Sequence, residues 1–113
     1  MPQIGGYSIY RNLDLDPTGV VVKATAGRLY GWWIANANAS ARFVKLYNKA
    51  TAAAETDTPV MTLRIPGATS ESEEFQGGIS FATGISARAT TGVADNDTGD
   101  PTANDIVVNL LYK

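Results

Sequence analysis

The densest group of potential metal ligands lies near the C-terminal end, where Asp95, Asp97 and Asp100 are interspersed with Asn, Thr and Gly. Closely spaced carboxylates supply the oxygen ligands that calcium prefers. The spacing does not fit an EF-hand, because Gly99 stands where the fifth-position ligand belongs and Ile106 replaces the bidentate glutamate. Two interpretations stay open, a calcium loop of another kind and a solvated connection rich in turn formers, and we expect the second.

A second acidic group, made of Glu71, Glu73 and Glu74, directly precedes Phe75. In a glycosidase, two such carboxyl groups would have to face each other across a cleft, about 5–9 Å apart. Three glutamates within four residues are more typical of a solvated surface turn between strands, and this is the interpretation that we favour.

The sequence lacks the usual partners of nucleophilic catalysis. It contains no histidine and no cysteine, which removes the commonest general base, thiol nucleophiles, thiolate zinc sites and disulfides. Residues 78–82 lack the second glycine of a nucleophile elbow, and neither a phosphate-binding loop nor a dinucleotide fingerprint is present. We therefore predict that the protein is not an enzyme and binds no cofactor.

Charge and hydropathy exclude two further classes of partner. Lys45, Tyr47 and Lys49 could form a small stacking surface for nucleic acid, but the net charge of −2 provides no field that would attract a polyanion. No apolar run approaches the roughly 18 residues of a membrane helix, and the N-terminus lacks a signal-peptide pattern. We expect no nucleic acid and no membrane partner, and synthesis in the cytoplasm.

The elements that must position these residues are β-strands. Runs rich in β-branched and aromatic residues alternate with clusters of Gly, Pro, Asn and Asp, which predicts six to eight strands. The expected strands are residues 20–25, 29–37, 42–47, 60–65, one or two within 75–85, and 106–112. The alanine-rich residues 50–55 are expected to form a loop. The pattern predicts an all-β fold, a single antiparallel β-sandwich, with jelly-roll connections favoured.

The chain length of 113 residues fits one domain. We expect residues 19–113 to form the sandwich and residues 1–18 to form an extended N-terminal arm. The arm carries Gly5, Gly6 and the aromatic pair Tyr7 and Tyr10, and it would dock on the domain or on a neighbouring molecule. The alternative is a loose terminus.

Several of the expected strands carry apolar residues on both faces. On a regular strand over residues 29–37, Trp33 would share one face with Leu29, and Trp32 would lie on the other face. The two tryptophans could then not enter the same core. The alternative is a bulge after Gly31 that turns both side chains inward.

The surplus apolar surface must be covered by the arm, by loops or by another subunit. Aromatic residues are enriched in the cores of subunit interfaces, so we predict contacts with other protein subunits. The candidate interface residues are Tyr7, Tyr10, Tyr30, Trp32, Ile34, Phe43 and Tyr47.

Four stretches of the sequence together resemble small proteins encoded in the genomes of tailed bacteriophages. The stretches are RLYGWWIAN (residues 28–36), ARFVKLYNKAT (41–51), GGISFATGI (77–85) and NDIVVNLLYK (104–113). The resemblance extends over about residues 19–113 and is one of overall pattern, so no site residues come with it.

The resemblance implies a virion structural protein. Small β-sandwich proteins of phages often serve as capsid decoration or cement proteins, which clamp neighbouring capsomers and are frequently trimers. We therefore expect a non-catalytic decoration protein on the capsid surface that binds the major capsid protein or other virion subunits. A homo-oligomer is expected, with a trimer favoured. The alternative function is a tail-fibre or baseplate module that recognises a host-surface glycan.

Overall fold

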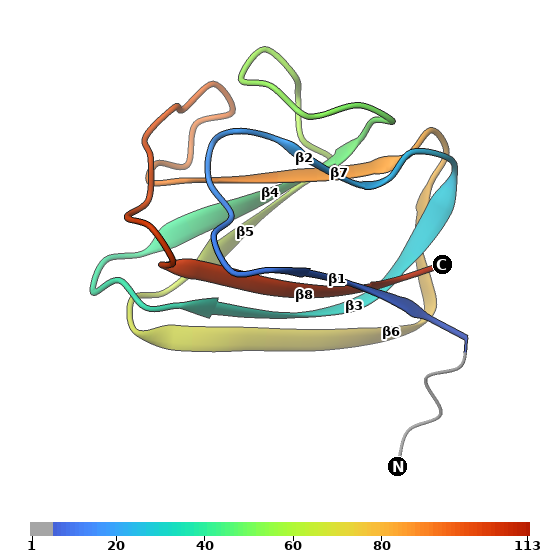
Figure 1. Cartoon of the computed structure of the whole chain (residues 1–113), viewed down its shortest axis with the longest axis horizontal. Helices are drawn as coiled ribbons and strands as arrows, with labels where there is room; N and C mark the ends of the chain where they lie inside the picture. Colours follow the sequence, from blue (N-terminus) through green and yellow to red (C-terminus); the bar gives the residue numbers. More distant parts are fainter. Residues whose placement is uncertain (1–5) are drawn as a thin grey trace.

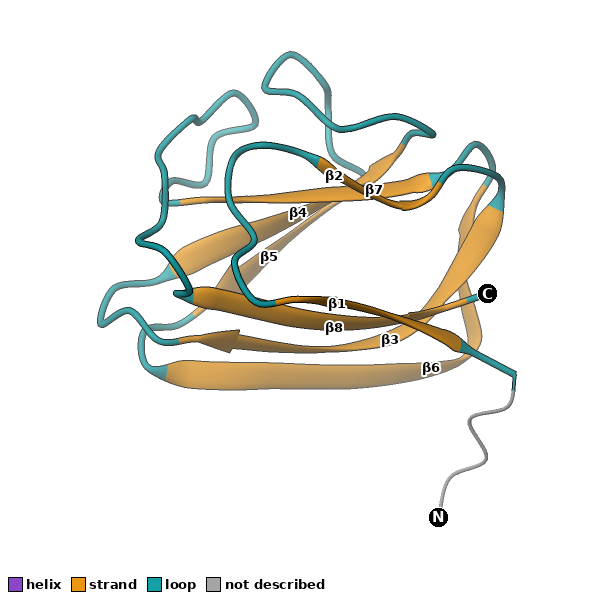
Figure 2. Cartoon of the chain, viewed as in Figure 1, coloured by secondary structure: helices purple, strands orange, loops and turns teal. Residues whose placement is uncertain are grey.

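The strands of this protein form two layers, as the computed structural model shows for residues 6–113, the part of the chain that it describes (Figure 1). Each layer is an antiparallel sheet of four strands. The described residues contain no helix (Figure 2), and accordingly none long and apolar enough to cross a membrane. The predicted all-β, antiparallel sandwich is confirmed. Its jelly-roll connections stay a prediction.

The two sheets share the strands evenly. Sheet A contains, in spatial order, β1 (Ser8–Asn12), β8 (Ile106–Tyr112), β3 (Gly27–Asn36) and β6 (Thr69–Phe81). Sheet B contains β2 (Val20–Lys23), β7 (Ile85–Thr90), β4 (Arg42–Asn48) and β5 (Met61–Ile65). Among the described strands, only β4 and β5 are consecutive in the chain and lie in the same sheet. Every other connection passes from one sheet to the other.

The core lies between the sheets and follows from the period-two alternation of the strands. In β8, Ile106, Val108 and Leu110 are fully buried, whereas the residues between them are half-exposed. Sheet B contributes Val44 and Leu46 from β4 to this core. The inward side chains of both sheets meet in one hydrophobic cluster.

A bulge interrupts the pairing of β3 with β6 and decides which tryptophan enters the core. The register passes from Leu29 opposite Ile79 to Gly31 opposite Glu74, so β6 has extra residues at this step. As a result, Leu29 and Trp32 both point inward, with exposed fractions of 0 % and 7 %, while Trp33 is 46 % exposed. The expectation of a regular strand was therefore wrong. A bulge does lie in β3, but it comes before Gly31, between Leu29 and Gly31, and it turns one tryptophan inward and not both.

The described part of the predicted N-terminal arm is built into the sandwich. Strand β1 pairs along its whole length with β8, and Tyr10 packs against the core. Leu15 is 1 % exposed within the core cluster, and its backbone N–H donates a hydrogen bond to the carbonyl of Ile106. Residues 1–5 of the predicted arm lie outside the described residues.

Candidate interaction surface

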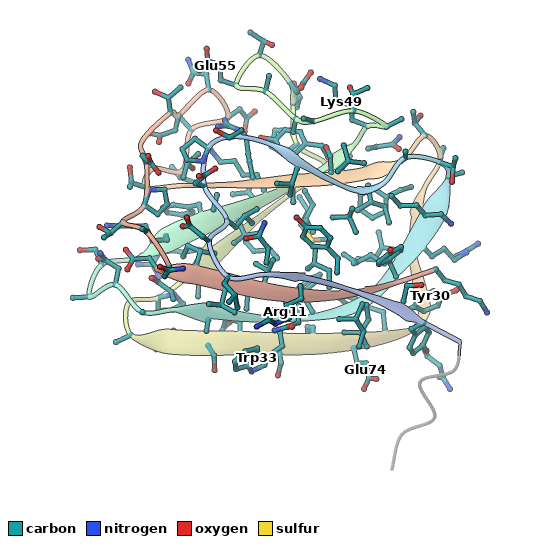
Figure 3. All side chains as sticks on the ribbon, in the orientation of Figure 1. Arg11, Tyr30, Trp33, Lys49, Glu55 and Glu74 are labelled. Atoms are coloured by element: carbon teal, nitrogen blue, oxygen red, sulfur yellow. The ribbon has the colours of Figure 1, made fainter. Side chains whose placement is uncertain are left out.

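The outer face of sheet A carries a row of side chains centred on Trp33. Trp33 lies opposite Ser72 of β6 and Asn109 of β8, and Asn109 in turn lies opposite Arg11 of β1. Directly opposed residues of neighbouring strands share a face of the sheet. The four side chains therefore cross the sheet from edge to edge, and Figure 3 shows Trp33 pointing away from sheet B.

The neighbouring rows extend this face in both directions. On one side, Ile9, Leu111 and Glu74 are aligned across β1, β8 and β6, with Gly31 of β3 between the last two. On the other side, Val107, Ala35 and Ser70 are aligned. Ile9 is 54 % exposed, and Leu111, Val107 and Ala35 are half-buried. We call the apolar part of this face the apolar strip, which consists of Ile9, Trp33, Ala35, Val107 and Leu111.

A shallow groove lies beside Trp33. Its apolar lining comes from Ala35, Ala37 and Val107, whose small side chains leave the flank of the tryptophan uncovered. Ser70 and Asp105 add polar groups to it. This combination of an aromatic side chain with a few polar groups can accept either an apolar protein side chain or a flat polar ligand.

Two of the predicted interface residues meet at the end of sheet A where β3 bulges. The rings of Tyr7 and Tyr30 stack with centroids 4.7 Å apart and planes inclined by 30°. Tyr7 also lines a small pocket with residues 74–76 of β6. The segment before β1 thus reaches across to β3 and β6, and it adds aromatic surface next to the apolar strip.

Three other predicted interface residues are inside the molecule. Trp32 is 7 %, Tyr47 is 1 % and Ile34 is 0 % exposed, so Tyr47 and Ile34 offer no surface to a partner and Trp32 offers only an edge that lines a surface pocket. Tyr10 and Phe43 are half-buried. The surface centred on Trp32 is thus corrected to one centred on Trp33, which sequence reasoning missed. The signal that could have identified it is Gly31, because a glycine within a strand often marks a bulge.

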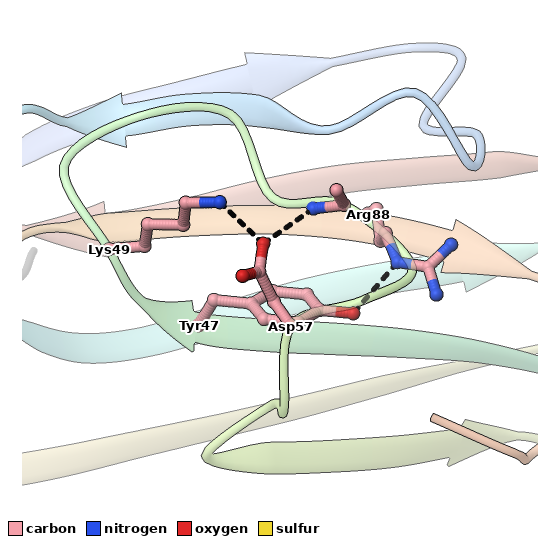
Figure 4. Close-up of polar contacts among 5 residues, drawn as sticks. Tyr47, Lys49, Asp57 and Arg88 are labelled. Atoms are coloured by element: carbon pink, nitrogen blue, oxygen red, sulfur yellow. Dashed lines mark hydrogen bonds and ion pairs between the residues drawn. The ribbon is translucent and has the colours of Figure 1, made fainter. Parts of the chain in front are cut away.

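The outer face of the two central strands of sheet B, β4 and β7, is covered by the chain itself. Polar side chains point outward from β4 and β7 but are fully buried beneath the loops 49–60 and 91–105. The Nε atom of Arg88 donates a hydrogen bond to the Tyr47 hydroxyl at 2.8 Å (Figure 4), and its Nη2 atom donates to the carbonyl of Asp95. Loops therefore cover Lys45 and Tyr47 on the second face of β4, whereas Phe43 on the same face is half-buried.

Burial shifts the pKa of two groups in this layer. Desolvation lowers the pKa of the Lys45 ammonium, and the neighbouring positive charge of Arg88 lowers it further. Burial raises the pKa of the Tyr47 hydroxyl, although the hydrogen bond from Arg88 acts in the opposite direction. Lys45 donates a hydrogen bond to the carbonyl of Ala94, so both cations of this layer hold the loop 91–105 in place.

The acidic residues of the two loops also have structural contacts. Asp57 binds the Lys49 ammonium at 2.5 Å and accepts a hydrogen bond from the Ala54 backbone N–H at 2.8 Å (Figure 4). The carboxylate of Asp97 accepts hydrogen bonds from the backbone N–H groups of Gly92 and Gly99. Within residues 6–113, no group of three or more acidic side chains could hold a metal ion. Asp97 therefore acts as a turn former in its loop.

Comparisons with protein-family models, with curated proteins and with solved structures found no match for this chain. The resemblance to phage proteins thus stays a prediction, and the function has to be inferred from the residues of the molecule itself.

Proposed function

We propose that this protein is a non-catalytic structural subunit that binds other protein subunits through the outer face of sheet A. The observation that carries the proposal is Trp33, which is 46 % exposed in the middle of the apolar strip. Contiguous exposed apolar surface is typical of interaction sites, and tryptophan is enriched among the residues that dominate binding energy.

The contrast between the two sheets supports this choice of face. Burying the outer face of sheet B would require the loops 49–60 and 91–105 to move and the hydrogen bonds of Arg88 to break. Sheet A has no such cover over Trp33, Ile9 and Val107 in the described chain. A partner can therefore bury apolar surface there without first breaking internal contacts.

The assembly that we propose is the head of a tailed bacteriophage, with the protein as a decoration protein on the capsid surface. The sequence resemblance described above supports this assignment. The strand order β1-β8-β3-β6 and β2-β7-β4-β5 supports reading the sandwich as a jelly roll, an architecture found in viral capsid and lectin domains. This second support is an analogy at the level of the fold.

Decoration would act by burial of surface. Each Å² of apolar area removed from water contributes about 25 cal/mol, and the loss of translational and rotational freedom offsets much of this gain. Many copies that each bridge two capsid subunits would nevertheless add up, and they would raise the temperature at which the shell opens.

A direct test adds purified protein to phage heads that lack it and measures binding and the opening temperature. Trp33→Ala should weaken binding about thirtyfold, because a tryptophan hot spot contributes about 2 kcal/mol or more. Val93→Ala is the matched control, since Val93 is 62 % exposed in a loop far from the apolar strip in sequence and sheet. Heads that bind neither the wild type nor the control, or that bind Trp33→Ala equally well, would contradict the proposal.

A second function is favoured by the groove beside Trp33. The indole could stack on a sugar ring while Ser70 and Asp105 bind its hydroxyl groups. The same two variants therefore need to be tested against polysaccharides of the host envelope. Binding of glycan that depends on Trp33, without binding to heads, would assign the protein to a tail fibre or baseplate.

A further inference from the structure

The outer face of sheet A is complementary to itself, and we propose that the chain forms a two-fold dimer through this face. The dimer axis runs parallel to the strands, between β8 and β3. The inference rests on the proposed function in that it uses the same contact face, and it names the partner as a second copy of this chain. A copy in the dimer must therefore dissociate before this face binds another virion subunit.

Within the three rows of the face, the two charged side chains lie on opposite edges. Arg11 is on edge strand β1 and Glu74 is on edge strand β6, and both side chains are exposed. Among residues 6–113, the structure records one ion pair, between Lys49 and Asp57, so within that part of the chain neither edge charge is paired. Each copy thus presents a positive edge and a negative edge on one face.

This distribution selects the orientation of the second copy. A two-fold axis parallel to the strands places β1 of one copy over β6 of the other, so Arg11 faces the row of Ser72. Glu74 lies two residues farther along β6, about 7 Å away, within reach of an arginine side chain. An axis across the strands would instead place β1 over β1 and bring like charges together, which is unfavourable.

The shapes of the facing strands agree with the same axis. Rotation places β8 of one copy over β3 of the other, and β8 presents Leu111 and Val107 where β3 presents Gly31 and Ala35. Each larger side chain thus lies over a small residue, as interdigitating sheets about 10 Å apart require. Trp33 of each copy lies beside Asn109 of the other. The two central strands are therefore matched in all three rows, whereas at the edges Ile9 lies over Glu74.

The size of the face predicts a weak dimer. The four strands are about 4.8 Å apart, and the two shorter ones, β1 and β8, are five and seven residues long, which limits the contact area to about 15 by 20 Å. This is less than the roughly 800 Å² per partner that a standard interface buries. We expect dissociation in the micromolar range, so that both forms are accessible to measurement.

Charge exchange between variants of the full chain provides the test. In sedimentation equilibrium, the wild type should dimerise. Arg11→Glu alone and Glu74→Arg alone should each dimerise at least about tenfold more weakly, because each substitution creates two like-charge contacts in the dimer. An equimolar mixture of the two variants should recover the dimer, because both contacts then join Glu to Arg. Arg64→Glu, a reversal on exposed β5 of sheet B, is the control and should dimerise as the wild type does.

A wild type that stays monomeric at millimolar concentration, or forms trimers, overturns the inference. Failure of the mixture to associate, with both variants folded by circular dichroism, also overturns it. The two proposals fail separately. A monomer whose binding to phage heads depends on Trp33 keeps the proposed function and rejects the dimer. A charge-exchanged dimer that binds no virion subunit keeps the dimer and rejects the decoration role.

Discussion

At the scale of single residues, the polar side chains with the strongest contacts hold loops against the sandwich. Arg88 and Lys45 bind backbone carbonyls of one loop, and Asp57 fastens the other loop to Lys49. The hydrogen bond from Lys49 and that from the Ala54 N–H hold the pKa of Asp57 below its ordinary value of 3.8. Folding therefore favours the ionised form of this carboxyl group.

The lowered pKa predicts a specific dependence of stability on pH for Asp57→Asn. Because the folded pKa lies below the unfolded one, the stabilisation by Asp57 is present above about pH 4 and is lost as pH falls below 3.8. The side chains of Lys49 and Asp57 are 33 % and 28 % exposed, so solvent limits the effect to about 0.5–1 kcal/mol at pH 7. Urea unfolding should show the wild type losing this advantage between pH 4 and pH 2.

Lys49→Met provides the matched variant for this pair. Its loss at pH 7 should equal that of Asp57→Asn, and the double variant should lose little more than either single one, because both remove the same interaction. A difference between wild type and Asp57→Asn that stays constant from pH 7 to pH 2 would show that the charge of Asp57 has no such role.

The environment of single side chains was harder to predict from the sequence than the fold. The types of residue pointed correctly to a surplus of apolar surface, but the face of each side chain depends on register. One bulge exchanged the environments of Trp32 and Trp33. Likewise, nothing in the sequence around Tyr47 indicates that a distant Arg88 and two loops would cover it.

At the scale of elements, the bulge between β3 and β6 depends on glycine. Gly78 has a φ of +75°, and a Cβ atom at this position would lie 2.9 Å from the ring of Tyr30. An L-residue is strained in this conformation, and the contact adds crowding. The Tyr30 ring lies close to the backbone of Gly78, and in this position it stacks on the ring of Tyr7.

We therefore predict that Gly78→Ala lowers the free energy of unfolding by about 1–3 kcal/mol. Gly77→Ala is the control in the same bulge, because a Cβ atom there meets nothing within 4 Å. It should change stability by less than about 0.5 kcal/mol. Thermal and urea unfolding of both variants measure the difference, and equal losses would mean that Gly78 is not required for the bulge.

Most strands were predictable because alternation and turn residues are local signals. The expected residues 42–47 and 106–112 correspond to β4 and β8 within one residue. Strand β7 was not separated as an element, since its alanines have low strand propensity and its buried Ser86, Arg88 and Thr90 resemble a solvated face. Strand β1 was not predicted as a strand of the sheet, because its pairing with β8 is a long-range contact.

At the scale of the whole molecule, the segment before β2 joins the two sheets. The N–H of Leu15 donates to the carbonyl of Ile106 in sheet A, and the carbonyl of Asp16 accepts from the N–H of Ala89 in sheet B. The Leu15 side chain lies between them in the core at 1 % exposure. Residues 13–18 therefore close one side of the sandwich.

This role predicts that substitutions of two leucines, only two positions apart, differ greatly in their effect on the free energy of unfolding. Leu15→Ala should lower the free energy of unfolding by about 2–5 kcal/mol, because it leaves a cavity among residues of both sheets. Leu13→Ala should cost less than about 0.5 kcal/mol, since Leu13 is 44 % exposed. The measurement is urea unfolding followed by a probe of the whole fold. A segment that merely docked on a finished domain would detach in Leu15→Ala and leave the main transition unchanged, whereas a segment that closes the core must shift that transition.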